Sequence, residues 1–281
     1  MILIADSGST KTKWSVDGGR MILSEGINPY YQTENEIEES VGESFVDIDT
    51  SKIQQIYFYG AGCNNAEVNS IVERALHSVF KNADIDVNSD LLGAARSVCQ
   101  SEKGIACILG TGSNSCSYDG RDIVKNVSPL GFILGDEGSG AVLGKRFIGD
   151  LLKNQLSDSL TSRFYQQYGL SYADILASVY KKEFPNRFLA QFTKFMNTNI
   201  DAPQIEYIVR TEFRSFLERN VLQYDNARSM PINFVGSIAY HFSTILKSEA
   251  EKLGLSIGRV EQEPIKGLVE YHRNLIDTTM I

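Results

Sequence analysis

An aspartate followed by a loop of small and hydroxyl-bearing residues lies at the start of the sequence. Residues 1–19 read MILIADSGSTKTKWSVDGG, and the apolar run that ends at Asp6 predicts a buried strand. Gly8 has no side chain, so the backbone N–H groups of the loop can approach a phosphate closely. Asp6 can hold Mg²⁺ through water, because this ion prefers carboxylate and phosphate oxygens. A hairpin with an exposed acid is the alternative interpretation. The loop would also present hydroxyls to a ligand at close range, those of Ser7, Ser9, Thr10 and Thr12.

A second loop of similar composition, GTGSNS at residues 110–115, follows another apolar run. Both regions read as strand, loop, strand, Asp-Gly turn and strand, with the turns at Asp17-Gly18 and Asp119-Gly120. Glycine tolerates the positive φ that tight hairpin turns require. Two such loops that face each other across a cleft between domains can enclose the phosphates of a nucleotide. The pair therefore favours nucleotide binding over two plain hairpins.

The repeated module predicts two α/β domains, divided where QSEKG separates a helical pattern from the second set of strands. We expect an N-terminal domain over residues 1–103 and a C-terminal domain over residues 104–281. The region 157–216 is expected to be mostly helical, with breaks at Pro185 and Pro203. Further helices are predicted over residues 71–82, 91–100 and 138–156.

Composition excludes several classes of protein. The chain has 281 residues and a net charge of −8, which disfavours binding to nucleic acid or to an anionic membrane. No run is long enough to cross a bilayer and no secretory signal is evident, so the cytoplasm is expected. The four cysteines contain no C-x-x-C pair, and we interpret them as thiols rather than disulfides. The three histidines lack the spacing of metal ligands.

Five motifs, spread in order from Asp6 to Ala239, carry a resemblance to a known family. They are DSGSTKTK, NSDLLGAA, GTGSNS, GDEGSG and FVGSIA. In this order they resemble the N-acetylglucosamine kinase and BadF/BadG/BcrA/BcrD ATPase family of the sugar kinase–Hsp70–actin superfamily. The resemblance implies an α/β fold of two ribonuclease H-like, or actin-like ATPase, domains with a nucleotide and substrate cleft between them.

The resemblance also implies nucleotide contacts. The first phosphate loop would comprise Asp6, Gly8, Thr10 and Lys11, with Asp6 holding Mg²⁺ through water. The second phosphate loop and the adenosine contacts would comprise Gly110, Thr111, Gly112, Ser113, Gly236 and Ser237.

For the sugar, the resemblance implies that Asp90 is the general base. A base is needed because a sugar hydroxyl that attacks the γ-phosphate must lose its proton. The alternative for Asp90 is a helix N-cap, since NSD precedes the helical LLGAARS, and the same alternative applies to Asp136 before EGSGAVLGKRF. Capping and catalysis are compatible. The sugar pocket would be lined by Asn28, Gly112, Asn114, Gly131 and Asp136.

The implied function is an ATP-dependent amino-sugar kinase that phosphorylates a hydroxyl of N-acetylglucosamine or a related hexosamine. Its cofactors would be ATP and Mg²⁺, its partner a small amino sugar, and a homodimer stays open. Leu130 stands where the family usually has an aromatic residue, so N-acetylmuramic acid and glucosamine remain alternatives. Two other classes also remain. One is a BadF-type activator ATPase, which needs suitably placed cysteines for an iron–sulfur cluster, and the other is a non-catalytic sugar sensor.

Overall fold

The computed structural model describes residues 1–8 and 10–279, so Ser9 of the first loop lies outside the described residues. The chain forms two compact units. Unit 1 comprises residues 1–103, 118–123 and the chain from Glu263 onward, and unit 2 comprises residues 104–117 and 124–262. This division differs from the single boundary expected at residue 104, because the last helix packs against elements of the first unit.

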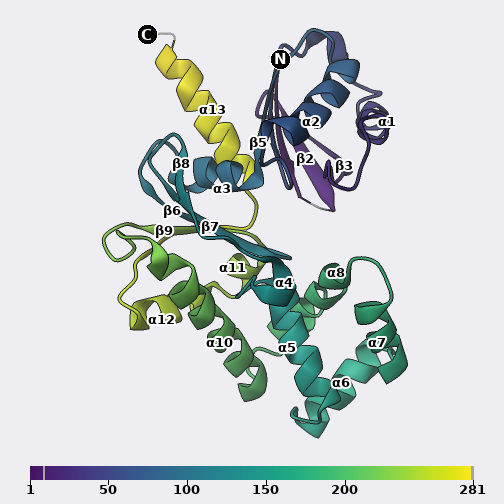
Figure 1. Ribbon diagram of the computed structural model, residues 1–281, viewed down its shortest axis with the longest axis vertical. Coiled ribbons are helices and arrows are strands. Elements are labelled where there is room, and N and C mark those ends of the chain that lie inside the picture. The colour runs from purple at the N-terminus through teal and green to yellow at the C-terminus, as the bar shows by residue number, and fades with distance from the viewer. Residues whose placement is uncertain (9, 280–281) are drawn as a thin grey trace. The chain divides into compact units, whose positions relative to one another are not determined.

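Unit 1 is built on a five-stranded sheet in the order β3-β2-β1-β4-β5 (Figure 1). Strand β1 pairs antiparallel with β2, which pairs antiparallel with β3, whereas β4 and β5 extend the sheet in parallel. Asp17 and Gly18 have φ values of 48° and 70°, as a type I′ turn between β2 and β3 requires. The strands are β1 (Ile2–Ser7), β2 (Lys11–Val16), β3 (Arg20–Glu25), β4 (Gln55–Gly60) and β5 (Asp84–Ser89).

Helices cover both faces of this sheet. Alternation along β1 sends Leu3 and Ala5 into the core beneath α1 and α2, together with Trp14 of β2. The opposite face carries Ile4, which packs with Tyr59 and the start of α13. Asp6 follows Ile4 by two residues and therefore lies on this second face. The helices of unit 1 are α1 (Glu34–Ser44), α2 (Ala66–Val79), α3 (Asp90–Cys99) and α13 (Ile265–Thr279), with a 3₁₀ turn at Thr50–Lys52.

Unit 2 repeats the plan with a sheet in the order β10-β9-β6-β7-β8. Strands β6, β9 and β10 run parallel, and the second small-residue loop joins β6 to β7. The two predicted α/β modules are thus confirmed. The strands are β6 (Gly104–Leu109), β7 (Ser113–Tyr118), β8 (Ile123–Asn126), β9 (Ile232–Val235) and β10 (Ile257–Glu261).

The region 157–216 is helical as predicted, and breaks between helices lie directly before Pro185 and Pro203. Pro185 and Pro203 occupy the first turn of α8 and of α10, where the missing N–H costs no hydrogen bond. The helices of unit 2 are α4 (Gly131–Leu134), α5 (Gly140–Leu152), α6 (Asp158–Tyr168), α7 (Tyr172–Tyr180), α8 (Pro185–Ala190), α9 (Thr193–Thr198), α10 (Pro203–Arg219), α11 (Ser237–His241) and α12 (Ser243–Lys252), with a 3₁₀ turn at Val221–Gln223.

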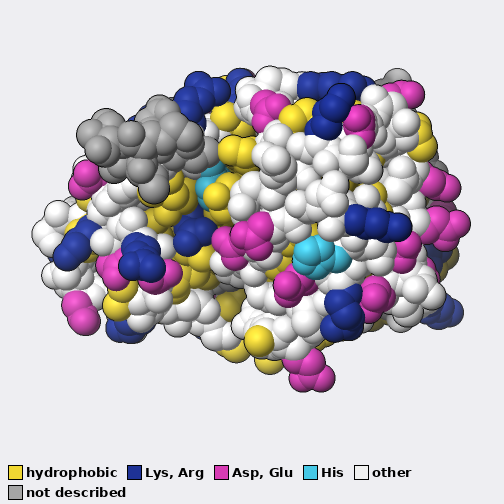
Figure 2. All heavy atoms as spheres, turned by 90° about the horizontal axis from the view of Figure 1, so that it is seen from above, with side chains coloured by type: hydrophobic (Ala, Val, Ile, Leu, Met, Phe, Trp, Pro, Cys, Tyr) yellow, Lys and Arg dark blue, Asp and Glu magenta, His cyan; other side chains and the backbone are white. Residues whose placement is uncertain are grey.

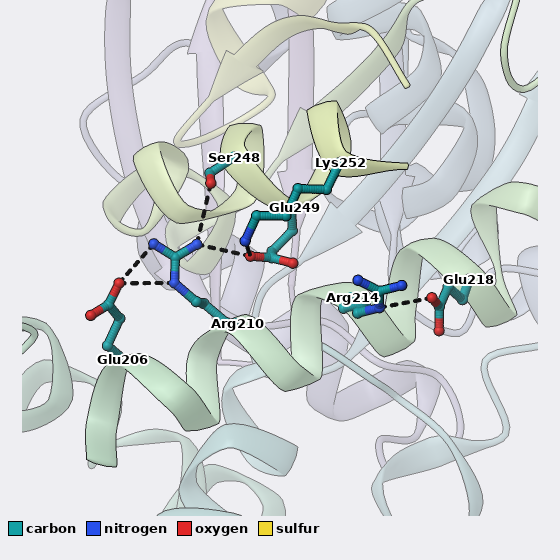
Figure 3. Close-up of polar contacts among 7 residues, drawn as sticks. All are labelled: Glu206, Arg210, Arg214, Glu218, Ser248, Glu249 and Lys252. Atoms are coloured by element: carbon teal, nitrogen blue, oxygen red, sulfur yellow. Dashed lines mark hydrogen bonds and ion pairs between the residues drawn. The ribbon is translucent and has the colours of Figure 1, made fainter. Parts of the chain in front are cut away.

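An ion network joins α10 to α12 (Figure 3). Arg210 of α10 binds Glu206 one turn earlier, and its Nη1 lies 2.8 Å from Oε1 of Glu249 on α12. Lys252 reaches the same Oε1 of Glu249 at 2.6 Å. Burial raises the pKa of Glu249, but the hydrogen bonds from Lys252 and Arg210 more than offset this, so its pKa lies below the usual range. The network fixes the helices that cover the sheet of unit 2.

The surface and the thiols agree with the composition. Among the described residues, no helix is long and apolar enough to span a membrane. All four cysteines are buried and none is in a disulfide. On the face shown in Figure 2, Lys and Arg side chains lie among Asp and Glu side chains.

Candidate functional site

Asp6 lies at the carboxyl end of β1, among charged groups from three other parts of unit 1. The strand register puts it directly opposite Lys13 of β2 and Tyr59 of β4, so these side chains share a face of the sheet. Burial and the charges of Asp90 and Glu263 raise the pKa of Asp6 to about 7, against the opposing effect of Lys13 and Lys11. Ionisation of Asp6 is therefore unfavourable unless a cation lies close to its carboxylate.

Glu263, just before α13, was not among the predicted site residues. One of its carboxylate oxygens lies 3.2 Å from Nζ of Lys11, and the other accepts a hydrogen bond from Nζ of Lys13. Burial raises the pKa of Glu263, but the bonds from Lys13 and Lys11 outweigh it and hold the pKa low. The spacing of Lys11 and Lys13 by two residues in a strand was the one available signal for a shared anionic partner.

The first loop is organised differently from the expectation. The hydroxyls of Ser7 and Thr12 bond each other at 2.7 Å and are buried, and they also bond Ile27 and Glu25. The expectation that these two hydroxyls face a ligand is therefore wrong, because both side chains point into the core beneath the hairpin. Gly8 and Thr10 are exposed at the tip. The Gly8 N–H bonds the carbonyl of Lys11 at 3.1 Å, and a Cβ on Gly8 would find no atom closer than 3.8 Å.

Asp90 is the first residue of α3, not its cap. Ser89 is the N-cap, and its hydroxyl accepts from the N–H of Leu92 at 3.2 Å. The cap interpretation of Asp90 is therefore wrong. Burial raises the pKa of Asp90 to about 6, although its own N–H and that of Leu91 stabilise the charged form. Gly93, one turn later, lets α3 approach Tyr59, since a Cβ there would lie 2.8 Å from the Tyr59 Cβ.

Asn28 contacts the loop that follows β4, and Cys63 of this loop lies near Asp90. The Oδ1 of Asn28 accepts from the N–H of Tyr30 at 3.1 Å and would lie 2.8 Å from a Cβ on Gly62. Gly62 has a φ of 86°, so the conformation and the space both require glycine. The next residue, Cys63, is buried, and its thiol pKa is raised to about 12 by burial and by the charge of Asp90. Within unit 1 the structure thus brings Asn28, Asp6 and Asp90 into one neighbourhood.

In unit 2, the second loop is tied to the start of α5. The N–H of Gly140 bonds the carbonyl of Gly110 at 2.8 Å, and that of Ala141 bonds the carbonyl of Thr111 at 3.0 Å. The N–H of Gly110 bonds the carbonyl of Gly112 at 2.9 Å, which closes the loop. A Cβ on Gly110 would meet nothing within 4 Å, so open space lies beside this residue. The loop is therefore held by backbone hydrogen bonds and has open space beside Gly110.

Gly236 and Ser237 adjoin this loop because β9 lies next to β6. A Cβ on Gly236 would lie 2.2 Å from the carbonyl oxygen of Leu109, and its φ is 122°. Only glycine allows the chain to turn there against the second loop. Ser237 is exposed at the start of α11. The structure therefore brings together the two segments predicted to contact the nucleotide in this unit.

Asp136 is also brought to the second loop. Its Oδ1 accepts from the N–H of Ser113 at 3.3 Å, and its Oδ2 would lie 3.2 Å from a Cβ on Gly112. Burial raises the pKa of Asp136 to about 6. The cap interpretation is again wrong, since Ser139 caps α5. Asp136 has a φ of 55°, a left-handed conformation that is rare for non-glycine residues and concentrated at functional sites.

The other two predicted sugar residues of unit 2 are placed less tightly. Gly131 begins the exposed turn that ends at Asp136, whose N–H bonds the carbonyl of Pro129 at 2.9 Å. Asn114 lies in β7, and its Oδ1 already accepts from Ser115 and Asn126 at 2.9 Å each. A ligand would therefore meet the Asn114 amide through its NH₂ group rather than its oxygen.

A cavity of about 460 Å³ in unit 2 lies next to Asp136, because Gly135 and Glu137 are among its lining residues. Its lining includes Glu137, Lys145, Arg146 and Glu212, and none of the predicted site residues is among the described residues that line it. Lys145 and Arg146 are exposed residues of α5. No group of three or more His, Cys, Asp or Glu among the described residues is arranged to hold a metal ion. A metal here would need oxygens from a ligand in addition to Asp6.

Comparisons with known proteins identify similar structures over nearly the whole chain. A Porphyromonas gingivalis protein provisionally assigned as an N-acetylglucosamine kinase matches with 49% identity and a TM-score of 0.94, over 98% of this chain and 99% of that one. A Chromobacterium violaceum protein with the same provisional assignment matches over 96% and 98% of the two chains, with 14% identity and a TM-score of 0.69. No family model and no curated protein matches the sequence.

A more distant structure has the same fold. A non-polymerising mutant of MamK bound to AMPPNP matches with 13% identity and a TM-score of 0.55, over 97% of this chain and 98% of that one. At this identity the likeness concerns the fold alone. Together with the two mixed sheets, it confirms the predicted α/β fold of two actin-like ATPase domains.

Proposed function

Because the chain belongs to the N-acetylglucosamine kinase family, we propose that it is an ATP-dependent kinase that phosphorylates a hydroxyl of N-acetylglucosamine or a related hexosamine. The single observation that carries the proposal is that Asp90 lies near enough to Asp6 for its charge to raise the pKa of Asp6. Asp90 begins α3, is partly buried, and has its pKa raised to about 6. A base with such a pKa is ionised at neutral pH and is still basic enough to take a proton.

The proposed reaction transfers the γ-phosphoryl group of ATP to the sugar. The sugar hydroxyl oxygen forms the new bond to phosphorus, the bond to the ADP oxygen breaks, and Asp90 takes the hydroxyl proton. Positioning and neutralisation of charge supply most of the acceleration in such transfers. In this assignment Asn28 and Asp136 hold the sugar, with Gly112, Asn114 and Gly131.

The nucleotide contacts are proposed for each unit. In unit 1, the exposed tip at Gly8 and Thr10 and the ammonium group of Lys11 would meet phosphate oxygens. In unit 2, the open space at Gly110 supports a phosphate contact by residues 110–113, and the turn at Gly236 and Ser237 would adjoin the adenosine.

Asp6 fits a role in holding Mg²⁺. It supplies a hard oxygen donor, its charge is unfavourable without a cation, and Mg²⁺ usually takes one or two carboxylates together with phosphate oxygens and water. When bound, Mg²⁺ would neutralise charge on the phosphates. The pairing of β1 with β2 and β4 holds the Asp6 carboxylate in place at the end of β1.

A coupled assay of ADP release tests the proposal. It compares N-acetylglucosamine, N-acetylmuramic acid, glucosamine and glucose as acceptors, with a no-sugar control. Turnover that depends on an amino sugar supports the kinase. ATP hydrolysis that no sugar stimulates would instead favour an activator ATPase, and sugar binding without turnover would favour a sensor.

A further inference from the structure

Two lysines of the first hairpin share one carboxylate. Lys11 and Lys13 lie on the same face of β2, and Glu263 binds the ammonium of each with a separate oxygen. Glu263 reaches them from a segment 250 residues later in the chain. It comes just after the chain leaves unit 2 and re-enters unit 1.

We propose that Glu263 is a positioning residue for nucleotide binding, which holds Lys11 and Lys13 in place beside Asp6 so that ATP meets a fixed ammonium group at Lys11. This inference rests on the proposed function, because it takes ATP as the ligand of the hairpin. The role differs from that of Asp90, since Glu263 acts through the lysines and not on the reacting atoms.

The contacts favour positioning over masking of the lysines. An ammonium group has three N–H donors, and the bond to Glu263 uses one of them. The Lys11 side chain remains 60% exposed while it is bound, so its other donors are open to a ligand. The Lys13 side chain is only 21% exposed and lies opposite Asp6. Glu263 thus orients both lysines and leaves Lys11 accessible.

A fixed lysine binds an anion better than a mobile one. A free lysine side chain samples many rotamers, and this freedom is lost when the ammonium contacts phosphate. When the protein has already ordered the side chain, binding no longer carries that cost. Loss of Glu263 would also remove a negative charge near the phosphates. This change alone would strengthen the binding of ATP. That charge is already balanced by two ammonium groups at contact distance, so we expect the loss of order to dominate.

The test uses the full chain with the substitution Glu263→Gln, which keeps the size of the side chain and removes its charge. We expect the KM for ATP and the dissociation constant of Mg²⁺-AMPPNP, measured by calorimetry, to rise about tenfold. The KM for the sugar and kcat at saturating ATP should change less than about threefold, because Asp90 and the sugar contacts are untouched. Glu263→Asp should recover part of the affinity, since a shorter carboxylate can still reach one lysine.

The matched control is Glu25→Gln. Glu25 lies opposite Lys11 on β3 and is exposed, so this variant removes the same charge from beside the hairpin without touching the bridge. We expect it to bind Mg²⁺-AMPPNP like wild type. Tighter binding by Glu263→Gln would show that Glu263 masks the lysines, and unchanged binding would show that it does not position them. Either result overturns the inference, whereas failure of the wild-type protein to bind Mg²⁺-AMPPNP would overturn the proposed function itself.

Discussion

Replacement of Asp90 by asparagine removes the proposed base and keeps the size of the side chain. The structure predicts a small effect on folding. Ser89 still caps α3, and an amide oxygen can accept the same N–H bonds from residue 90 and Leu91. Loss of a negative charge at a helix N-terminus costs about 0.3–1 kcal/mol. Relief of the burial of that charge acts in the opposite direction, so the free energy of unfolding should change by less than about 1 kcal/mol.

The catalytic effect of Asp90→Asn should be much larger. An amide cannot take the hydroxyl proton, and loss of a general base typically lowers kcat by about 10²–10⁴-fold, or roughly 2.7–5.4 kcal/mol in the barrier. The affinities for ATP and sugar should stay within severalfold of wild type, because the ground-state contacts are mostly kept. The gap between a small folding effect and a large kinetic effect is what identifies a base.

The assay is ADP release with N-acetylglucosamine as acceptor, paired with urea unfolding of the same preparations. Asp136→Asn is the matched control. Its amide oxygen can still accept from Ser113, so we expect mainly a higher KM for the sugar. Asp136 also has a pKa raised to about 6, so it is the second candidate for the general base. If Asp90→Asn turns over normally and Asp136→Asn is inactive, the two carboxylates have been exchanged in our assignment.

Three further predictions follow from the same geometry. Gly8→Val should leave the fold intact, because the φ of Gly8 is not left-handed and the space around it is open. The new side chain would occupy the place of the phosphate, so ATP binding measured by calorimetry should weaken about tenfold. Unchanged affinity would remove the loop tip from the site. The kcat/KM for sugar should fall as the pH drops through about 6, not about 4, because Asp90 must be ionised to act as a base; a flat profile down to pH 4.5 contradicts this. Tyr59→Phe removes the hydroxyl that binds Arg96 at 2.9 Å and His272 at 2.8 Å. The free energy of unfolding, measured in urea, should therefore fall by about 1–3 kcal/mol. An unchanged midpoint would mean that these hydrogen bonds do not stabilise the fold.

The sequence predicted the fold well because its signals are local. Apolar runs, small-residue loops and Asp-Gly turns recur in both halves, and each specifies a strand, a loop or a hairpin by itself. The assignment of α13 to the first unit could not be predicted in this way. It depends on Ile265 and Leu268 packing against Ile4 and Tyr59, which are more than two hundred residues away in the chain. Pairings of this kind leave no trace in the local pattern.

The sequence named candidate site residues, but it did not predict which residues cap α3 and α5 or where the Ser7 hydroxyl points. Ser89 and Asp90 are both good capping residues, and the local sequence does not decide which of them caps α3. That one-residue difference determines which side chain accepts the N–H of Leu92, and in the structure this is Ser89. The inward placement of Ser7 was available from the alternation Leu3, Ala5, Ser7 along β1, and the interpretation of the loop as a run of hydroxyls overlooked it.

The raised pKa values of Asp6 and Asp90 imply that these two carboxyls lower the stability of the fold at neutral pH. Each carboxyl binds its proton more tightly in the folded chain, at about pH 7 for Asp6 and about 6 for Asp90, than its ordinary value of 3.8 would allow. Between about pH 4 and pH 7 the native state therefore holds more protons than the unfolded chain, and stability falls as the pH rises through that range. The lysines beside Asp6 offset only part of this cost. In the proposed reaction, Mg²⁺ would offset this cost at Asp6, and Asp90 would take the proton of the sugar hydroxyl.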